Sequence, residues 1–176
     1  MYFLRELERK DVSQINKWRN NPELISFLGA PFRYINEQVD NEWFDAYMRQ
    51  RNTCVRCAIV DENDYLFGTV SLVNINSTNQ SATFNIMIGD LNNCSKGIGT
   101  FAVKEMLKHA FLNMNLHRVE LTVLPSNKRA QAVYEKCGFI YEGTKRKCVY
   151  KNGKFEDMMI YSVLKEDYLK QGEQND

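Results

Sequence analysis

The segment Asn92–Thr100 combines small polar residues, one lysine and two glycines, and it lies between two strongly patterned stretches. The stretch before it, Ser81–Ile88, alternates apolar and polar residues as a β-strand does, and the stretch after it, Val103–Met114, repeats apolar residues at helical spacing. A loop that opens a helix directs free backbone N–H groups and the positive end of the helix dipole to one place. The segment therefore predicts an anion site, and pyrophosphate is the anion that we expect.

A second segment with chemistry-bearing residues runs from Asn127 to Phe139 and contains a tyrosine at position 134. Pro125-Ser126 predicts the start of a helix here, and Gly138 predicts its end. The apolar face of this helix is expected to consist of Ala130, Val133 and Cys137.

The rest of the pattern predicts the elements that hold these two segments. A first strand, Tyr2 to Glu8, precedes helices that Asp11 or Ser13 and Asn36 can cap. Further strands are expected at Cys54–Val60, Tyr65–Val73, Ser81–Ile88 and Val119–Val123, and in a hairpin, 139–150 with 155–164, that turns at Asn152-Gly153. No linker or repeat interrupts this order, so we expect one α+β domain over residues 1–170 and a polar tail over residues 171–176.

Composition excludes several functional classes. The 176 residues are 44% hydrophobic and carry a formal net charge of +1, so no overall field attracts nucleic acid or an anionic membrane. No apolar run approaches the roughly 20 residues of a membrane span, and Arg5 follows the first apolar residues too soon for a signal peptide. We therefore expect a cytoplasmic protein.

The five cysteines, Cys54 and Cys57 among them, are expected to be free thiols. Their number is odd, and no second Cys/His pair accompanies Cys54 and Cys57.

The order of elements, together with the residues of the two segments, resembles the GNAT superfamily of acyl-CoA-dependent N-acetyltransferases. The similarity runs from Leu4-Arg5 to Tyr168, and it is greatest to the branch of ribosomal-protein N-terminal, spermidine and amino-sugar acetyltransferases. It implies a three-layer α/β/α fold around a mixed, mostly antiparallel sheet of about seven strands, with helices on both faces. It also implies acetyl-CoA as the co-substrate, direct attack of a primary amine on the thioester, and no metal.

The resemblance assigns the predicted anion site to the pyrophosphate of coenzyme A. The loop departs from the family's pattern at Cys94, where Gln or Arg is usual, and at Ser95, where Gly is common. Binding is expected to persist, because backbone N–H groups hold the phosphates and Lys96 adds a positive charge. The residues assigned to this loop are Cys94, Ser95, Lys96, Gly97, Ile98, Gly99 and Thr100.

The second segment resembles the family's Asn…Tyr-x-Lys-x-Gly-Phe signature. The resemblance implies that Asn127 contacts the pantetheine arm and that Tyr134 protonates the departing thiolate, for which a phenol with a pKa of about 10 is suited. The alternative is that Tyr134 only packs in its helix. Further cofactor contacts are expected from Arg129, Ala130 and Lys136, and from the fourth strand, beside a splay in the sheet, at Ile86, Met87 and Ile88.

The acceptor side of the site is less defined. Where many relatives have a glutamate in the fourth strand this sequence has Thr83, and Asn85 on the same face can hydrogen-bond a substrate but cannot take a proton, so no general base is assigned. His109 and His117 are expected to be surface or capping residues. The basic residues of the hairpin, which could meet a phosphate-bearing substrate, are expected to form a solvated strand face: Lys145, Arg146, Lys147, Lys151 and Lys154.

The expected acceptor is a small-molecule amine (a polyamine, an amino sugar or a nucleotide-linked amino sugar) or a protein N-terminus, and a homodimer is one candidate assembly. The early helices lack an evident acidic cluster, which slightly disfavours spermidine.

Two other functions are alternatives to the acetyltransferase. One is a dinucleotide-binding protein, because Gly97–Ala102 fits Gly-x-Gly-x-x-Gly/Ala and Glu120 follows about twenty residues later. The other is a non-catalytic acetyl-CoA sensor, which the substitution at Cys94 makes conceivable.

Overall fold

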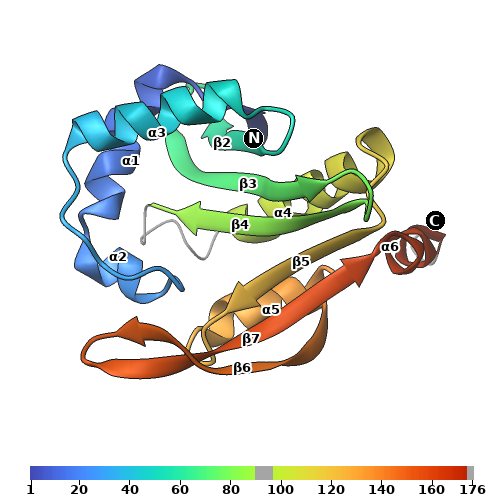
Figure 1. Cartoon of the computed structure of the whole chain (residues 1–176). Coiled ribbons are helices and arrows are strands. Elements are labelled where there is room, and N and C mark those ends of the chain that lie inside the picture. Colours follow the sequence, from blue (N-terminus) through green and yellow to red (C-terminus); the bar gives the residue numbers. More distant parts are fainter. Residues whose placement is uncertain (90–96, 174–176) are drawn as a thin grey trace.

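Seven strands form one mixed sheet in the computed structural model of the chain, which describes residues 1–89 and 97–173 (Figure 1). The spatial order is β1-β2-β3-β4-β5-β7-β6, and β4 with β5 is the one parallel pair in this sheet. The strands are β1 (Tyr2–Glu6), β2 (Val55–Asp61), β3 (Leu66–Asn76), β4 (Ser81–Ile88), β5 (Arg118–Val123), β6 (Ile140–Lys151) and β7 (Lys154–Leu164). The predicted fold class is confirmed. A single parallel pair also excludes the doubly wound sheet of a dinucleotide fold.

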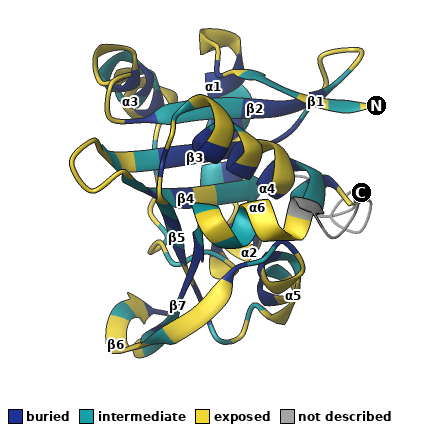
Figure 2. Ribbon diagram, turned by 90° about the vertical axis from the view of Figure 1, so that its right-hand side faces the viewer, coloured by how far each residue is buried: buried dark blue, intermediate teal, exposed yellow. Residues whose placement is uncertain are grey.

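Helices cover both faces of the sheet and enclose two apolar clusters. On one face lie α1 (Val12–Arg19), α2 (Pro22–Ser26) and α3 (Glu37–Arg49), and on the other lie α4 (Ile98–Lys108) and α5 (Lys128–Lys136). One-turn helices precede α1 (η1, Arg9–Asp11) and follow α4 (η3, His109–Asn113). Figure 2 shows that buried residues line the centre of the sheet, whereas the outer strand β6 is largely exposed. In the described residues no helix is both long enough and apolar enough to cross a membrane.

Local signals in the sequence set several of these boundaries. Asn36 caps α3, because its side chain accepts a hydrogen bond from the Val39 N–H at 3.0 Å. The hairpin turns at Asn152 and Gly153, whose φ values of 49° and 82° fit the expected turn. After β4 the chain passes Gly89, where an added Cβ would lie 1.8 Å from the Trp18 ring. Only glycine fits this position, which fixes the exit of β4 against α1.

Two expectations differ from the structure. The helix expected from Pro125 begins at Lys128, because Asn127 is its N-cap. Its buried face consequently carries Gln131, Tyr134 and Cys137, while Ala130 and Val133 are only partly buried. Of the predicted polar tail, residues 171–173 are helical, because α6 (Lys165–Glu173) packs onto α4's side of the sheet, with the Tyr168 and Phe111 ring centroids 5.2 Å apart.

An ion pair ties the outer strand β6 to β5. Arg118 donates to both Glu142 oxygens at 2.7 and 2.6 Å, and Ser162 donates to the same carboxylate at 2.6 Å. These hydrogen bonds, Arg118 first, lower the pKa of Glu142 from 4.5 to about 2. Because the folded pKa lies below the unfolded one, the stabilisation is present above pH 4.5 and is lost as the pH falls towards 2.

Glu142→Gln is therefore expected to reduce the free energy of unfolding at pH 7 by about 1 kcal/mol, a value kept small because the carboxylate is 39% exposed. At pH 2 the variant and the wild type should unfold at the same denaturant concentration. Urea titrations at several pH values measure this. A difference that does not change with pH would assign the effect to packing instead of charge.

Candidate active site

The parallel strands β4 and β5 separate part of the way along the sheet. They pair only from Ser81 to Thr83 on β4, opposite Arg118 to Glu120 on β5, although β4 continues to Ile88. Figure 1 shows the two strands diverging beyond this point. This is the splay that was expected beside the fourth strand, and it leaves one edge of β4 unpaired at its C-terminal end.

The free edge of β4 presents backbone N–H groups to the splay. The Gly89 N–H donates to the Phe67 carbonyl of β3 at 2.9 Å. Because successive N–H groups of a strand point to opposite sides, those of Ile86 and Ile88 point away from β3. They are backbone donors that a ligand in the splay can use as an additional strand would.

A cavity of about 1290 Å³ passes through this splay and reaches both faces of the sheet. The lining from β4 comprises Phe84, Asn85, Ile86, Met87 and Ile88. On the α4–α5 side the lining includes Gly97, Gly99, Thr100, Asn127, Arg129, Ala130, Tyr134 and Lys136. On the α2–hairpin side it includes Glu23, Phe27, Gly29, Arg56, Ser71, Lys145, Cys148 and Met158. We use the names α4–α5 side and α2–hairpin side for these two parts below.

The start of α4, where an anion site was predicted, lies on the α4–α5 side. Gly97 adopts φ 78° and precedes the first helical residue, Ile98, which is fully buried. The first N–H groups of a helix lack partners within the helix. In this turn Gly99 and Thr100 line the cavity, so the free N–H groups of the turn lie at that end of the cavity. Lys136 of α5 adds a positive charge to the same side. The assigned residues Cys94, Ser95 and Lys96 lie outside the described residues.

Tyr134 is held on α5 with its ring in the core and its hydroxyl group at the cavity. Its ring centroid lies 6.2 Å from that of Phe84 and 5.8 Å from that of Phe139. Burial raises the pKa of Tyr134 to about 12, so the phenol keeps its proton at neutral pH. The hydroxyl group makes no hydrogen bond to any residue that the structure describes. The side chain therefore packs in the core and also lines the cavity, and its role as an acid stays a prediction.

Asn127 connects α5 to the opposite side of the cavity. Its Oδ1 accepts a hydrogen bond from the Ala130 N–H at 3.1 Å, and its Nδ2 donates to the Phe27 carbonyl at 3.0 Å. The second bond spans 100 positions of the chain. Asn127, which is predicted to contact the cofactor, thus also holds the segment after α2 against the start of α5 at the cavity.

Lys151 was expected on a solvated strand face, and that expectation is wrong. Its Nζ is buried and donates to the carbonyls of Ile25, Leu28 and Ala30 at 2.8, 2.6 and 2.8 Å. The ammonium caps the C-terminal end of α2, where helix carbonyls lack partners. Burial lowers the pKa of Lys151. No local pattern identifies this residue, because its partners lie far away in the sequence.

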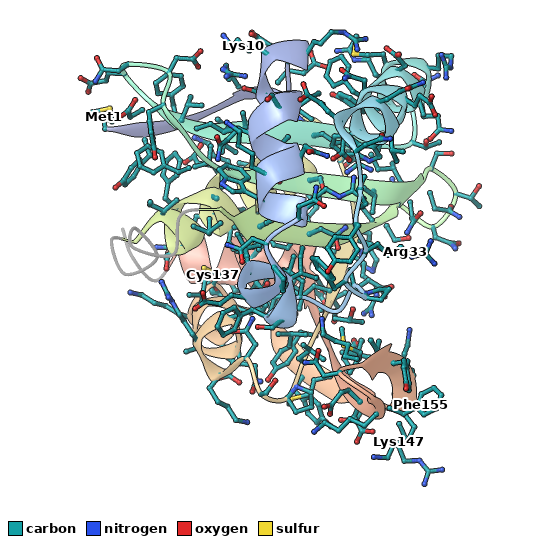
Figure 3. The ribbon with its side chains drawn as sticks, turned by 90° about the vertical axis from the view of Figure 1, so that its left-hand side faces the viewer. Met1, Lys10, Arg33, Cys137, Lys147 and Phe155 are labelled. Carbon is teal, nitrogen blue, oxygen red and sulfur yellow. The ribbon has the colours of Figure 1, made fainter. Side chains whose placement is uncertain are left out.

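The other hairpin lysines differ from Lys151. Lys145 lines the cavity, whereas Lys147 and Phe155 lie at the outer end of the hairpin in Figure 3. The structure does not bring Thr83 to the cavity, since it lies in a separate hollow beside Ser81 and Glu120. His117 lines that same hollow, and neither histidine is among the residues of the main cavity. Within the described residues, no cluster of His, Cys, Asp or Glu could hold a metal ion.

Two cavity residues that the sequence did not single out are Arg56 and Glu23. Arg56 is the second residue of β2 and lines the α2–hairpin side. Glu23 lies in the first turn of α2 and is the sole carboxylate among the described residues that line the cavity. Both could have been noticed only from tertiary structure, because a charged residue in a strand or at a helix start has common structural roles.

Comparison with known proteins places the chain among acetyltransferases. A family model described as an acetyltransferase (GNAT) domain matches residues 2–140. The chain is 30% identical over 171 residues to a spermidine N(1)-acetyltransferase of Vibrio cholerae serotype O1, covering 97% of this chain and 96% of that one. It is 34% identical to a putative ribosomal N-acetyltransferase, YdaF, of Bacillus subtilis over 58% of this chain and 56% of the relative. A crystal structure of Vibrio cholerae spermidine N-acetyltransferase in complex with CoA and spermine superposes with a TM-score of 0.88 at 29% identity, covering 96% and 98% of the two chains.

Proposed function

The chain belongs to the GNAT family of acetyltransferase domains, and from this premise we propose that it acetylates the primary amine of a small molecule at the β4–β5 splay. The predicted N-acetyltransferase activity and the use of acetyl-CoA are confirmed by the family match and by the similarity to a CoA-bound relative. The residues that carry the reaction, and the acceptor, are the subject of the proposal.

Acetyl-CoA occupies the α4–α5 side with its thioester at the free edge of β4. The N–H groups of Ile86 and Ile88 hold the pantetheine arm and the thioester oxygen, where they stabilise the negative charge that develops on attack. The helix start at Gly97–Thr100, with Lys136 and Arg129, holds the pyrophosphate. This arrangement leaves the α2–hairpin side to the acceptor.

Tyr134 is the general acid of the proposed reaction. The neutral amine attacks the carbonyl carbon, a C–N bond forms, and the nitrogen releases one proton to solvent. The C–S bond breaks with the electron pair on sulfur, and the tyrosinate left after the next step regains its proton from solvent. The thiolate then takes the Tyr134 proton, which the buried phenol retains because its pKa is about 12. The observation that carries this role is a tyrosine hydroxyl at the cavity with no hydrogen-bond partner in the described part of the chain.

A panel of amines tests the proposed function and identifies the acceptor. Thiol release from acetyl-CoA should be followed with spermidine, amino sugars, amino acids and a peptide with a free N-terminus. We expect amine-dependent thiol release with at least one small-molecule amine, together with formation of its N-acetyl derivative. Tight CoA binding without turnover of any of these amines would instead favour an acetyl-CoA sensor.

A further inference from the structure

Arg56 is a charged cavity residue that has no part in the reaction proposed above. It reaches the α2–hairpin side from the start of β2, where it is the second residue of the strand. Its guanidinium carbon lies 4.8 Å from the centre of the Trp43 ring and 5.9 Å from that of Tyr47. Stacking on an aromatic face fixes the plane of a guanidinium and leaves its N–H groups to bind in that plane.

Apart from the two aromatic rings, the Arg56 guanidinium has no hydrogen-bond or ion-pair partner in the described residues. Its Nε is buried without a hydrogen bond, and no carboxylate forms an ion pair with it in this part of the chain. Glu6, the carboxylate beside Tyr47, already binds Arg51 at 2.8 Å and the Tyr47 hydroxyl at 2.7 Å. The terminal nitrogens of Arg56 also make no hydrogen bond in the described residues, but unlike Nε they are not buried, and a ligand in the cavity that Arg56 lines is their natural partner.

The position of Arg56 relates it directly to the reacting end of β4. Arg56 pairs with Ser71 on β3, and Ser71 pairs with Asn85 on β4, so the three form one row across the sheet. All three line the cavity, and Ser71 is buried while Asn85 is exposed. With strands about 4.8 Å apart, the two ends of the row are separated by roughly 10 Å. A small acceptor can therefore contact Arg56 and place its amine near the edge of β4.

The charges on this side oppose a polycation. Arg56 and Lys145 line it, against the single carboxylate Glu23. Asp40, the buried acidic residue of α3, already pairs with Arg19, and none of the acidic residues of α3 is among the described residues that line the cavity. A polyamine would meet like charge here, whereas an anionic group would meet a stacked guanidinium with free donors.

We propose that the acceptor amine carries a carboxylate or a phosphate, which Arg56 binds and which aligns the amine with the thioester. The inference rests on the proposed function and specifies its substrate class. Ser71 and Asn85 supply neutral hydrogen-bonding groups between the anion and the amine. Arg56 sets acceptor specificity in this scheme and does not touch the acetyl group.

The test compares acceptors that differ only in the anionic group. Glucosamine 6-phosphate with glucosamine examines phosphate, and L-alanine with L-alaninamide examines carboxylate, while spermidine serves as the polycation. Each is measured by thiol release and, independently of turnover, by calorimetric binding to the CoA complex. The variants are Arg56→Gln, Arg56→Lys, and the matched control Arg51→Gln, which changes an exposed arginine outside the cavity.

We expect the wild type to favour the anionic member of at least one pair by about tenfold or more in kcat/KM or in affinity. Arg56→Gln should remove this preference without changing acetyl-CoA binding, Arg56→Lys should retain part of it, and Arg51→Gln should leave it unchanged. Arg56-dependent binding of the anionic amine without turnover would support the inference and contradict the proposed function. Turnover without a preference that depends on Arg56, or no such preference in binding, would overturn the inference.

Discussion

Replacement of Tyr134 by phenylalanine is expected to lower kcat by about 100-fold or more, the usual contribution of a positioned general acid. The ring should stay in place, because its contacts with Phe84 and Phe139 do not involve the hydroxyl group. Acetyl-CoA affinity and the melting temperature should therefore change little. Steady-state kinetics at saturating acceptor, with calorimetric titration of CoA, measure the two effects separately.

Tyr141→Phe is the matched control for this substitution. Tyr141 is exposed, lies outside the cavity and bonds to the Thr144 hydroxyl at 2.8 Å, so its loss should not affect turnover. The wild-type rate should not decline with rising pH through loss of the Tyr134 proton until the pH nears 12, the approximate pKa of this residue. An unchanged kcat in Tyr134→Phe would remove this side chain from the mechanism and leave it a packing role.

Lys151→Met is expected to have the largest effect on stability, a loss of about 3 kcal/mol in the free energy of unfolding. The substitution keeps an unbranched side chain that is one atom shorter, but leaves the carbonyls of Ile25, Leu28 and Ala30 without their common donor. Because Leu28 and Ala30 follow α2 and line the cavity, KM for the acceptor should rise while KM for acetyl-CoA stays unchanged. Urea unfolding and a two-substrate kinetic analysis provide the measurements.

Lys154→Met provides the comparison, because it removes a lysine from the same hairpin. The Lys154 side chain is 70% exposed, and in the described residues its ion pair is with Glu156. A loss below about 0.5 kcal/mol is expected there, as for most surface substitutions. Equal losses in the two variants would mean that the cap on α2 contributes nothing specific.

The parts of the fold that could be predicted from the sequence depend on short-range signals. The Asn36 cap, the alternation of β4 and the Asn152-Gly153 turn each act within a few residues, and each is present in the structure. The start of α5 was misplaced by three residues, because Pro125 and Asn127 are both strong start signals and hydrogen bonding selects the second.

The parts of the candidate site that could not be predicted depend on tertiary contacts. The Lys151 ammonium reaches the Ile25 carbonyl across 126 positions of the chain, and a lysine in a basic hairpin carries no sign of such a partner. Arg56 became notable only when strand register put it in one row with Ser71 and Asn85. The role of Tyr134 comes from a motif and stays a prediction, and the structure adds that its side chain lines the cavity with a pKa raised by burial.

The cap that Lys151 forms has a consequence for how such a protein can acquire a new acceptor. The α2–hairpin side is built mainly from two short stretches, 23–30 and 145–158, whereas the α4–α5 side comes from 97–136. Exchanging the first two stretches would redesign one substrate pocket and leave the other intact. The Lys151 cap joins those two stretches into one structural unit. Replacing either stretch alone would remove the hydrogen bonds that hold both in place.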